Sequence, residues 1–313
     1  MLQYLVILLD DTSVAYCHAE NPLTEVNLIS LDMLHQAITY GMKHNLMIQF
    51  VLPPYQMPEE YYTLMDSIDN IKIGRDVIVC HCIPESVTTE TVVLCISIDE
   101  FIENVFLVVN VLKQVKRLCI NYTDINKFSD DKIKKYESSL QVVAGAIIDE
   151  ICIGKRHEIN LITDRLNLSK MCNCNAGVNN ITIAPNGKFY LCPAFYYDEK
   201  NEIDTGIDYR TPHYDRSIGN LEAGLKNKNE QLLCLENSPL CNECDAYHCN
   251  RCVWLNQKMT YEINTPSHEQ CVISHIERNA AKILSDKMRD LGFETQIINE
   301  ISYLDPFEKL FKD

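Results

Sequence analysis

Short apolar runs alternate with amphipathic stretches over the first half of the chain. The apolar runs predict buried strands at residues 4–9, 46–52, 77–80, 92–96, 117–121 and 158–163. Between these runs, apolar residues recur with helical spacing and predict helices at residues 31–44, 59–68, 99–115 and 130–152. Ser30 is a candidate N-cap for the first helix. Continuous apolar strands separated by helices are typical of a parallel sheet with helices on its faces.

The number of strand–helix units predicts the architecture of this region. About six units lie in roughly 165 residues, whereas a complete eight-unit barrel typically needs about 250 residues. A partial (β/α)6 barrel therefore fits better than a complete barrel.

The pattern changes after residue 165, where turns become frequent. A Pro-Asn-Gly turn at residues 185–187 predicts a hairpin, the polar residues 198–216 predict a loop, and residues 268–291 predict a helix. We predict an α/β fold with the partial barrel at residues 1–167 and an α+β domain at residues 168–313.

The charge balance limits the classes of partner. The chain has 28 Lys and Arg against 44 Asp and Glu, a net charge of −16, and 46% hydrophobic residues. This composition is that of a folded protein, and it disfavours nucleic acid and anionic membranes because both are bound through Lys and Arg. The apolar residues 1–9 lack a basic segment and run into Asp10 and Asp11, so they predict a strand and not a signal peptide. We expect a cytoplasmic protein without a membrane-spanning segment.

Fifteen cysteines are the main chemical feature, and nine of them lie between Cys172 and Cys271. In a reducing compartment, clustered cysteines more often bind metal than form disulfides. Two C-x2-C pairs lie close together, and their tight turns can supply four thiolates to zinc or to an iron–sulfur cluster. The cysteines outside these pairs are numerous enough for a second centre. The competing interpretation, that these are buried apolar cysteines, fits poorly with four cysteines in twelve residues. The pairs are Cys241 with Cys244 and Cys249 with Cys252.

The order of these cysteines resembles the SPASM domain of radical S-adenosylmethionine peptide-modifying enzymes. That domain has a Cys, then Gly-x4-Cys, then C-x2-C-x5-C-x3-C, and a final Cys. This chain has Cys174, then Gly187 and Cys192, and its four-cysteine run is shorter by one residue in each of two gaps. The resemblance implies two [4Fe–4S] clusters, with zinc as the alternative metal. One cluster would be held by Cys241, Cys244, Cys249 and Cys271. The other would be held by Cys174, Cys192 and Cys252, with Cys172 or, as its rival, Cys234 as the fourth ligand.

The first domain departs from the enzymes it resembles. These enzymes carry C-x3-C-x2-C after the first strand, where this chain keeps Cys17 but has Val14 and Asp10 at the two earlier positions. The glycine-rich motif after the second strand is replaced by Pro53 and Pro54. We therefore expect that the chain does not cleave S-adenosylmethionine by the usual route, and whether it catalyses a step alone stays open. A cluster held by Cys17 with non-cysteine ligands is a further alternative.

Three segments resemble the CXXX repeat peptide maturase family. They are Tyr16-Cys-His-Ala-Glu-Asn-Pro22, Leu46-Met-Ile-Gln-Phe50, and His248-Cys-Asn-Arg-Cys252 through Thr265-Pro-Ser-His-Glu-Gln-Cys271. The resemblance implies an iron–sulfur accessory protein or maturase subunit. It would act with a true radical S-adenosylmethionine enzyme on a ribosomally made precursor peptide with Cys-x-x-x repeats. The alternative is a zinc-stabilised peptide-binding scaffold without a redox role.

Two sites in the barrel region have both a chemical and a structural interpretation. Asp10 and Asp11 are candidate general bases or cation ligands, or they begin a loop. His18 is a candidate contact to a substrate cysteine, or a hydrogen-bonded loop residue.

Other Cys and His residues are similarly open. Cys80-His81-Cys82 is a candidate small metal site or one face of a buried strand. His268 is an ordinary helix residue or a neighbour of the second cluster. The remaining barrel cysteines lie in apolar runs and are expected in the core: Cys95, Cys119 and Cys152.

Overall fold

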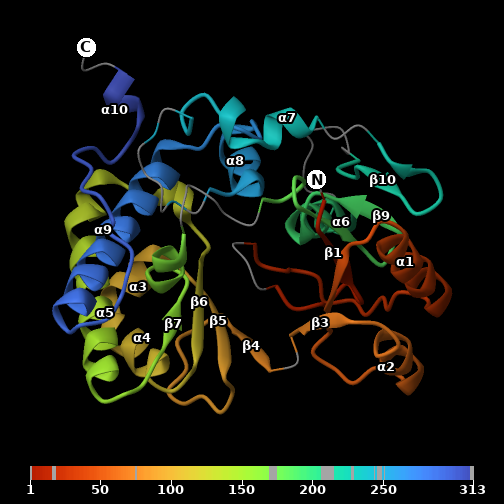
Figure 1. Ribbon diagram of the computed structural model, residues 1–313, viewed down its shortest axis with the longest axis horizontal. Coiled ribbons are helices and arrows are strands. Elements are labelled where there is room, and N and C mark those ends of the chain that lie inside the picture. The colour runs from red at the N-terminus through yellow and green to blue at the C-terminus, as the bar shows by residue number, and fades with distance from the viewer. Residues whose placement is uncertain are drawn as a thin grey trace. The chain divides into compact units, whose positions relative to one another are not determined.

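The computed structural model describes residues 2–15, 19–74, 76–168, 175–205, 215–226, 229–242, 244, 249 and 251–310 (Figure 1). The chain forms two compact units. Unit 1 contains residues 1–75 and 174–234, and unit 2 contains residues 76–173 and 235–313. Each unit takes residues from both sides of the expected domain boundary at residue 167, and that boundary stays a prediction.

Unit 1 is built on a sheet of seven strands in the order β11-β10-β9-β8-β1-β2-β3. Strands β8, β1, β2 and β3 are parallel, while β9, β10 and β11 are antiparallel additions. Strand β1 lies between β8 and β2, and its Leu5, Ile7 and Leu8 are fully buried. The strands are β1 (Tyr4–Leu8), β2 (Met47–Val51), β3 (Asn70–Ile73), β8 (Asn180–Ile183), β9 (Lys188–Tyr190), β10 (Gly219–Asn220) and β11 (Gly224–Leu225).

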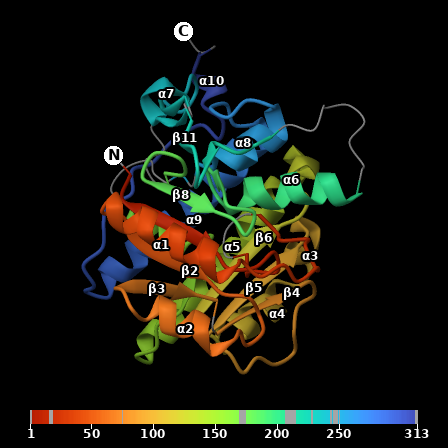
Figure 2. The same ribbon diagram turned by 90° about the vertical axis from the view of Figure 1, so that its right-hand side faces the viewer.

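The predicted first helix and the predicted hairpin of unit 1 are both present. Helix α1 (Leu31–Lys43) begins after Ser30, whose Oγ accepts a hydrogen bond from the backbone N of Met33 at 3.2 Å. The helix lies against β2 (Figure 2), and Gly41 makes this approach possible because a Cβ there would lie 2.7 Å from the side chain of Ile48. The turn between β8 and β9 contains Gly187 at a φ of 73°, where other residues are strained.

Unit 1 contains helices that the sequence pattern did not predict. Helix α2 (Glu59–Met65) was predicted, but the short α7 (Glu230–Leu233) and helix α6, which spans Pro193–Thr205, were not. The expectation of a loop from residue 198 is therefore wrong for residues 198–205. The physical reason is that residues 194–197 are apolar and buried, and the polar residues that follow continue the helix they begin.

Unit 2 is built on a four-stranded parallel sheet in the order β4-β5-β6-β7. Helices α5 and α9 lie side by side (Figure 1) and share one apolar core with the sheet. The strands are β4 (Val77–Cys80), β5 (Thr91–Ile96), β6 (Arg117–Tyr122) and β7 (Glu158–Ile159). The helices are α3 (Ile98–Glu103), α4 (Val105–Leu112), α5 (Ile133–Cys152), α8 (Val253–Thr260), α9 (His268–Asp290) and α10 (Phe307–Leu310). The short 3-10 turns of unit 2 are η1 (Ile125–Lys127), η2 (Asp130–Lys132), η3 (Thr163–Asn167) and η4 (Leu235–Asn237).

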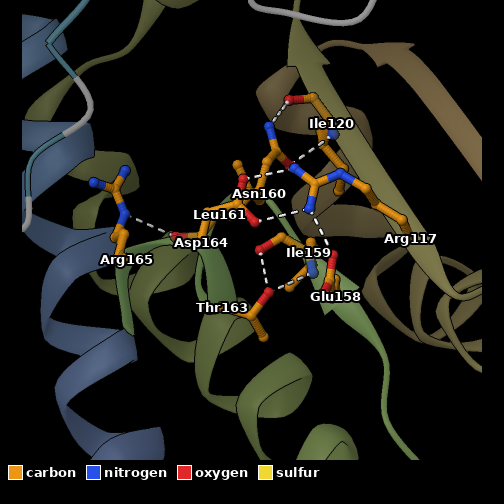
Figure 3. Close-up of polar contacts among 9 residues, drawn as sticks. All are labelled: Arg117, Ile120, Glu158, Ile159, Asn160, Leu161, Thr163, Asp164 and Arg165. Carbon is orange, nitrogen blue, oxygen red and sulfur yellow. Dashed lines mark hydrogen bonds and ion pairs between the residues drawn. The ribbon is translucent and has the colours of Figure 1, made fainter. Parts of the chain in front are cut away.

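The last strand of the predicted series is shorter than expected. Strand β7 ends at Ile159 because the hydroxyl of Thr163 accepts a hydrogen bond from the backbone N of Ile159 at 2.7 Å and donates one to its carbonyl at 2.9 Å (Figure 3). The side chain of Asn160 bonds the backbone N and O of Ile120 at 2.8 and 2.9 Å, as a strand backbone would. Side-chain bonds of this kind replace the strand ladder and turn the chain into η3.

Two predicted helices differ from the pattern in detail. The helix expected at residues 99–115 is divided at Asn104, whose side chain donates to the carbonyl of Glu100 at 3.0 Å. The helix expected at residues 268–291 is present as α9, and a capping box of Ser267 and Gln270 begins it. Within the described part of the chain, no helix has the length and apolar character to cross a bilayer.

Candidate functional site

Four cysteines of unit 2 line one cavity. Cys241, Cys244 and Cys249 come from the segment before α8, and Cys271 comes from the first turn of α9. These are the four residues that the SPASM resemblance assigned to one cluster. The rest of the wall consists of Arg251, Asn256, Pro266, Gln270, Ser274, His275 and Pro306.

Hydrogen bonds between α8 and α9 hold this wall in place. The Gln270 side chain is part of the capping box, and its Nε2 donates to Oδ1 of Asn256 at 3.1 Å. Asn256 is fully buried and donates in turn to the carbonyl of Ile263 at 3.1 Å. Cys271 therefore lies on a helix whose start is attached to the neighbouring helix of the site.

Two of the thiols have polar partners on α9. The Cys249 sulfur lies 3.1 Å from the hydroxyl of Ser274, and the Cys244 sulfur lies 3.7 Å from Nε2 of His275. The Tyr303 hydroxyl also donates to the Cys244 sulfur at 3.8 Å. The other ring nitrogen of His275, Nδ1, lies 3.0 Å from the carbonyl of Tyr303 and must donate to it. In neutral His275 this leaves Nε2 as the acceptor of the Cys244 thiol proton.

Burial and the proximity of the thiols to one another make the cavity unfavourable for free thiolates. The pKa of Cys241 is raised to about 12, chiefly by burial and also by the nearby Cys249 and Cys244, while Arg251 opposes this shift. Burial also raises the pKa of Cys249 and of Cys271. These thiols are therefore protonated near neutral pH, and binding of a metal centre would release their protons.

The donor set fits an iron–sulfur cluster in its chemistry. Four thiols around a cavity are the ligands of a [4Fe–4S] cluster, in which each iron takes one thiolate. Zinc instead draws four thiolates to about 2.3 Å from one ion. Among the described residues, no group of three or more His, Cys, Asp or Glu converges in the way a metal ion requires. In this structure the four cysteines line one cavity.

The residues predicted for the second cluster are divided between the two units or lie outside the described residues. Cys192 is buried in unit 1 directly before α6, and Cys252 lies in unit 2, where its sulfur accepts from the backbone N of Leu255 at 3.5 Å and caps α8. Cys172 and Cys174 lie outside the described residues. The rival ligand, Cys234, is half-buried at the end of α7 in unit 1. This second ligand set stays a prediction.

The loop after β1 is organised by two buried carboxylates. Asp10 accepts hydrogen bonds from the backbone N of Thr12 at 2.8 Å, the backbone N of Asn27 at 2.9 Å and the hydroxyl of Tyr55 at 3.0 Å. These hydrogen bonds fit the interpretation that Asp10 begins a loop.

The neighbouring carboxylate, Asp11, accepts hydrogen bonds from the Tyr196 hydroxyl and from Nδ2 of Asn27, and burial raises its pKa. Of the other residues considered in this loop, Val14 is buried in the apolar core. Cys17 and His18 lie outside the described residues.

The structure corrects two predictions about barrel cysteines. Strand β4 ends at Cys80, and Cys82 is exposed beyond it, so the two thiols do not share a strand face as expected. Cys152 is also exposed, because it is the last residue of α5, although its apolar neighbours predicted a core position. Cys95 and Cys119 are buried as expected.

The sequence left His268 open as an ordinary helix residue or a neighbour of the second cluster, and in the structure it does not contact the thiols of this cavity. Nδ1 of His268 lies 2.6 Å from Oδ2 of Asp305, and His268 does not line the cavity. His275 and Ser274 contact the thiols instead. Their spacing of three and four residues from Cys271 on a predicted helix was the available signal.

Comparisons with known proteins show the fold. No protein-family model and no curated protein matches the chain. Among solved structures, anSMEcpe with bound AdoMet and a Kp18Cys peptide has a TM-score of 0.60 and 12% identity, covering 91% of this chain and 99% of its own. The form with bound AdoMet has a TM-score of 0.58 and 12% identity, covering 92% and 100%. The form with a Cp18Cys peptide has a TM-score of 0.57 and 11% identity, covering 92% and 99%. The chain thus has the α/β fold of the radical S-adenosylmethionine/SPASM type that its sequence predicts.

Proposed function

We propose that this chain is an iron–sulfur protein of peptide maturation. It binds a [4Fe–4S] cluster through Cys241, Cys244, Cys249 and Cys271, and a second one through Cys172, Cys174, Cys192 and Cys252. It works in a reducing, cytoplasmic compartment as the accessory subunit of a radical S-adenosylmethionine enzyme. Its substrate is a ribosomally made precursor peptide with Cys-x-x-x repeats.

One observation carries this proposal: four cysteines from separate segments line a single cavity in a chain with this fold. The structural neighbour was solved with bound AdoMet and a peptide, which supports a peptide as the substrate class. In the loop where a catalytic cluster would need cysteines, Asp10 accepts hydrogen bonds and Val14 is packed in the apolar core. These two residues support an accessory role and not independent cleavage of S-adenosylmethionine.

The number of thiols suggests which chemistry the cluster supplies. A cluster with four cysteine ligands has no open iron position for a substrate thiolate, so its contribution is electron transfer. The protein's own part is to enclose the cluster. Cys241 is only 8% exposed, and Gln270 and Asn256 hold together the two helices of the wall.

Iron and sulfide analysis of anaerobically purified protein tests the proposal. We expect a brown protein with about eight iron and eight sulfide per chain, since each [4Fe–4S] cluster carries about four of each. The Cys271→Ser variant should lose about half of both. Cys152→Ser is the matched control, because Cys152 is an exposed cysteine of the same unit, and it should retain the full content. A colourless protein with stoichiometric zinc would refute the iron–sulfur proposal in favour of a zinc-stabilised scaffold.

A second experiment tests the accessory role. The reduced, isolated chain is incubated with S-adenosylmethionine, and 5′-deoxyadenosine is measured by chromatography. We expect none above a no-protein blank. Formation of 5′-deoxyadenosine at a rate that depends on the chain, and that is lost in Cys17→Ala, would contradict the accessory role and favour a cluster held by Cys17.

A further inference from the structure

A buried arginine near the cysteine cavity lacks the partners that such a residue normally requires. Arg278 is only 1% exposed, and its Nη2 donates to the carbonyl of Asn299 at 2.6 Å. Its Nε and Nη1 have no hydrogen-bond partner among the described residues. Because buried charged groups are costly unless they are paired, two unpaired guanidinium nitrogens indicate a missing anionic partner.

The position of Arg278 on α9 suggests what that partner is. Cys271, Ser274, His275 and Arg278 are spaced by three, one and three residues, so they lie on one face of the helix. The first three of these residues line the cavity, and Arg278 follows about 10 Å beyond Cys271 at a rise of about 1.5 Å per residue. Cys244 and Cys249 are within electrostatic range of its guanidinium, whose pKa is lowered by burial and raised by these two thiols.

Another buried arginine in this region, Arg165, is already neutralised by a carboxylate. Arg165 is 1% exposed and forms an ion pair with Glu277, and its Nε donates to the carbonyl of Leu161 at 2.9 Å. Arg278 forms no ion pair with any carboxylate of the described residues. Its positive charge therefore has no carboxylate partner among the described residues, and together with Arg251, which lines the cavity, it can balance a negative group there.

We propose that Arg278 is the counter-charge of the cluster bound by Cys241, Cys244, Cys249 and Cys271, and that it raises the reduction potential of that cluster. This inference rests on the proposed function. Four thiolates make a [4Fe–4S] centre anionic, and one-electron reduction adds a further negative charge. A buried positive charge beside the cavity stabilises the reduced state more than the oxidised state because the attraction grows with the negative charge.

Redox titration of anaerobically purified variants tests the inference. The reduced cluster is measured by electron paramagnetic resonance while dithionite supplies the electron at controlled potentials. In Arg278→Gln we expect at least a tenfold smaller ratio of reduced to oxidised cluster at a given potential. For a one-electron couple this is a downward shift of about 59 mV or more. Arg278→Lys retains the charge and should shift the potential by less than half as much.

Arg289→Gln is the matched control. It removes one positive charge from the same helix, but Arg289 lies about 16 Å further along at a rise of about 1.5 Å per residue, where it pairs with Asp286. We expect the cluster in Arg289→Gln to have the same reduction potential as the cluster in the unmodified protein. An Arg278→Gln protein that does not retain its cluster, while Arg278→Lys does, also supports the counter-charge.

Two results separate failure of this inference from failure of the proposed function. If the unmodified protein contains no iron and sulfide, the proposed function and the inference both fail. If all variants contain the same iron and sulfide but Arg278→Gln titrates like Arg289→Gln, the cluster stands and the role of Arg278 is refuted. Equal loss of the cluster from the Gln and Lys variants of residue 278 also refutes it, because charge would then not be the property that matters.

Discussion

Substitution of the buried ion pair between Arg165 and Glu277 is the most stringent test of how unit 2 is stabilised. Both side chains are almost completely buried, with 1% and 7% of their surface exposed. Glu277 also accepts a hydrogen bond from the hydroxyl of Tyr136 at 2.8 Å, and Tyr136 is fully buried in the core between the helices. The pair thus links η3, α5 and α9 through one carboxylate.

Replacing Glu277 with Gln leaves the guanidinium of Arg165 buried without a counter-charge. Removal of one partner of a buried ion pair costs about 3–5 kcal/mol. Gln retains an acceptor for the Tyr136 hydroxyl, so we expect the lower end of this range, about 3 kcal/mol. This is a large share of the roughly 5–15 kcal/mol by which proteins of ordinary stability are folded.

Anaerobic urea unfolding followed by far-ultraviolet circular dichroism measures the change. We expect a lower transition midpoint with an unchanged slope, which indicates a loss of stability without a change in the unfolded state. The decisive comparison is the double variant Arg165→Met with Glu277→Leu. Replacement of a buried pair by apolar residues is often neutral or stabilising, so the double variant should regain most of the loss. A double variant no more stable than Glu277→Gln would refute the argument that an uncompensated charge is the cause.

Two further predictions concern glycine and histidine positions. Gly187→Ala should lower the free energy of unfolding by about 1 kcal/mol or more, because Gly187 has a φ of 73°. Gly145→Ala should raise the free energy of unfolding by about 0.5–1 kcal/mol, since Gly145 lies inside α5 and an added Cβ would meet open space. Thermal unfolding measures both variants, and a shift of the same sign and size in the two would contradict both predictions. The Asp305 carboxylate raises the pKa of His268 above its unfolded value of 6.5. The stability that protonated His268 contributes to the fold is therefore complete below pH 6.5 and is lost as the pH rises through the folded pKa. His268→Gln should remove this part of the pH dependence of the free energy of unfolding.

Most strands of the parallel sheets could be predicted because they are buried on both faces. Residues 4–9 and 92–96 are apolar at every position and buried at nearly every one, so the prediction did not depend on which face meets the core. The weaker β3 has a mixed pattern, and it was missed. Helix α6 was missed for the related reason that most of its residues are polar, although its first turn is deeply buried.

The cysteine spacing by itself determined which residue types and which segments take part in the candidate site. Spacing reports on local turns, so it placed Cys241 and Cys244 together without any knowledge of the fold. Spacing did not group Cys271 with them; the resemblance proposed it, and the tertiary structure brings it to the same cavity because α9 packs beside α8. The tertiary structure also decided which charged side chains lie near the thiols. The counter-charge role of Arg278 is inferred from its burial and from its unpaired guanidinium nitrogens. Both are properties of three-dimensional packing, which no sequence pattern contains.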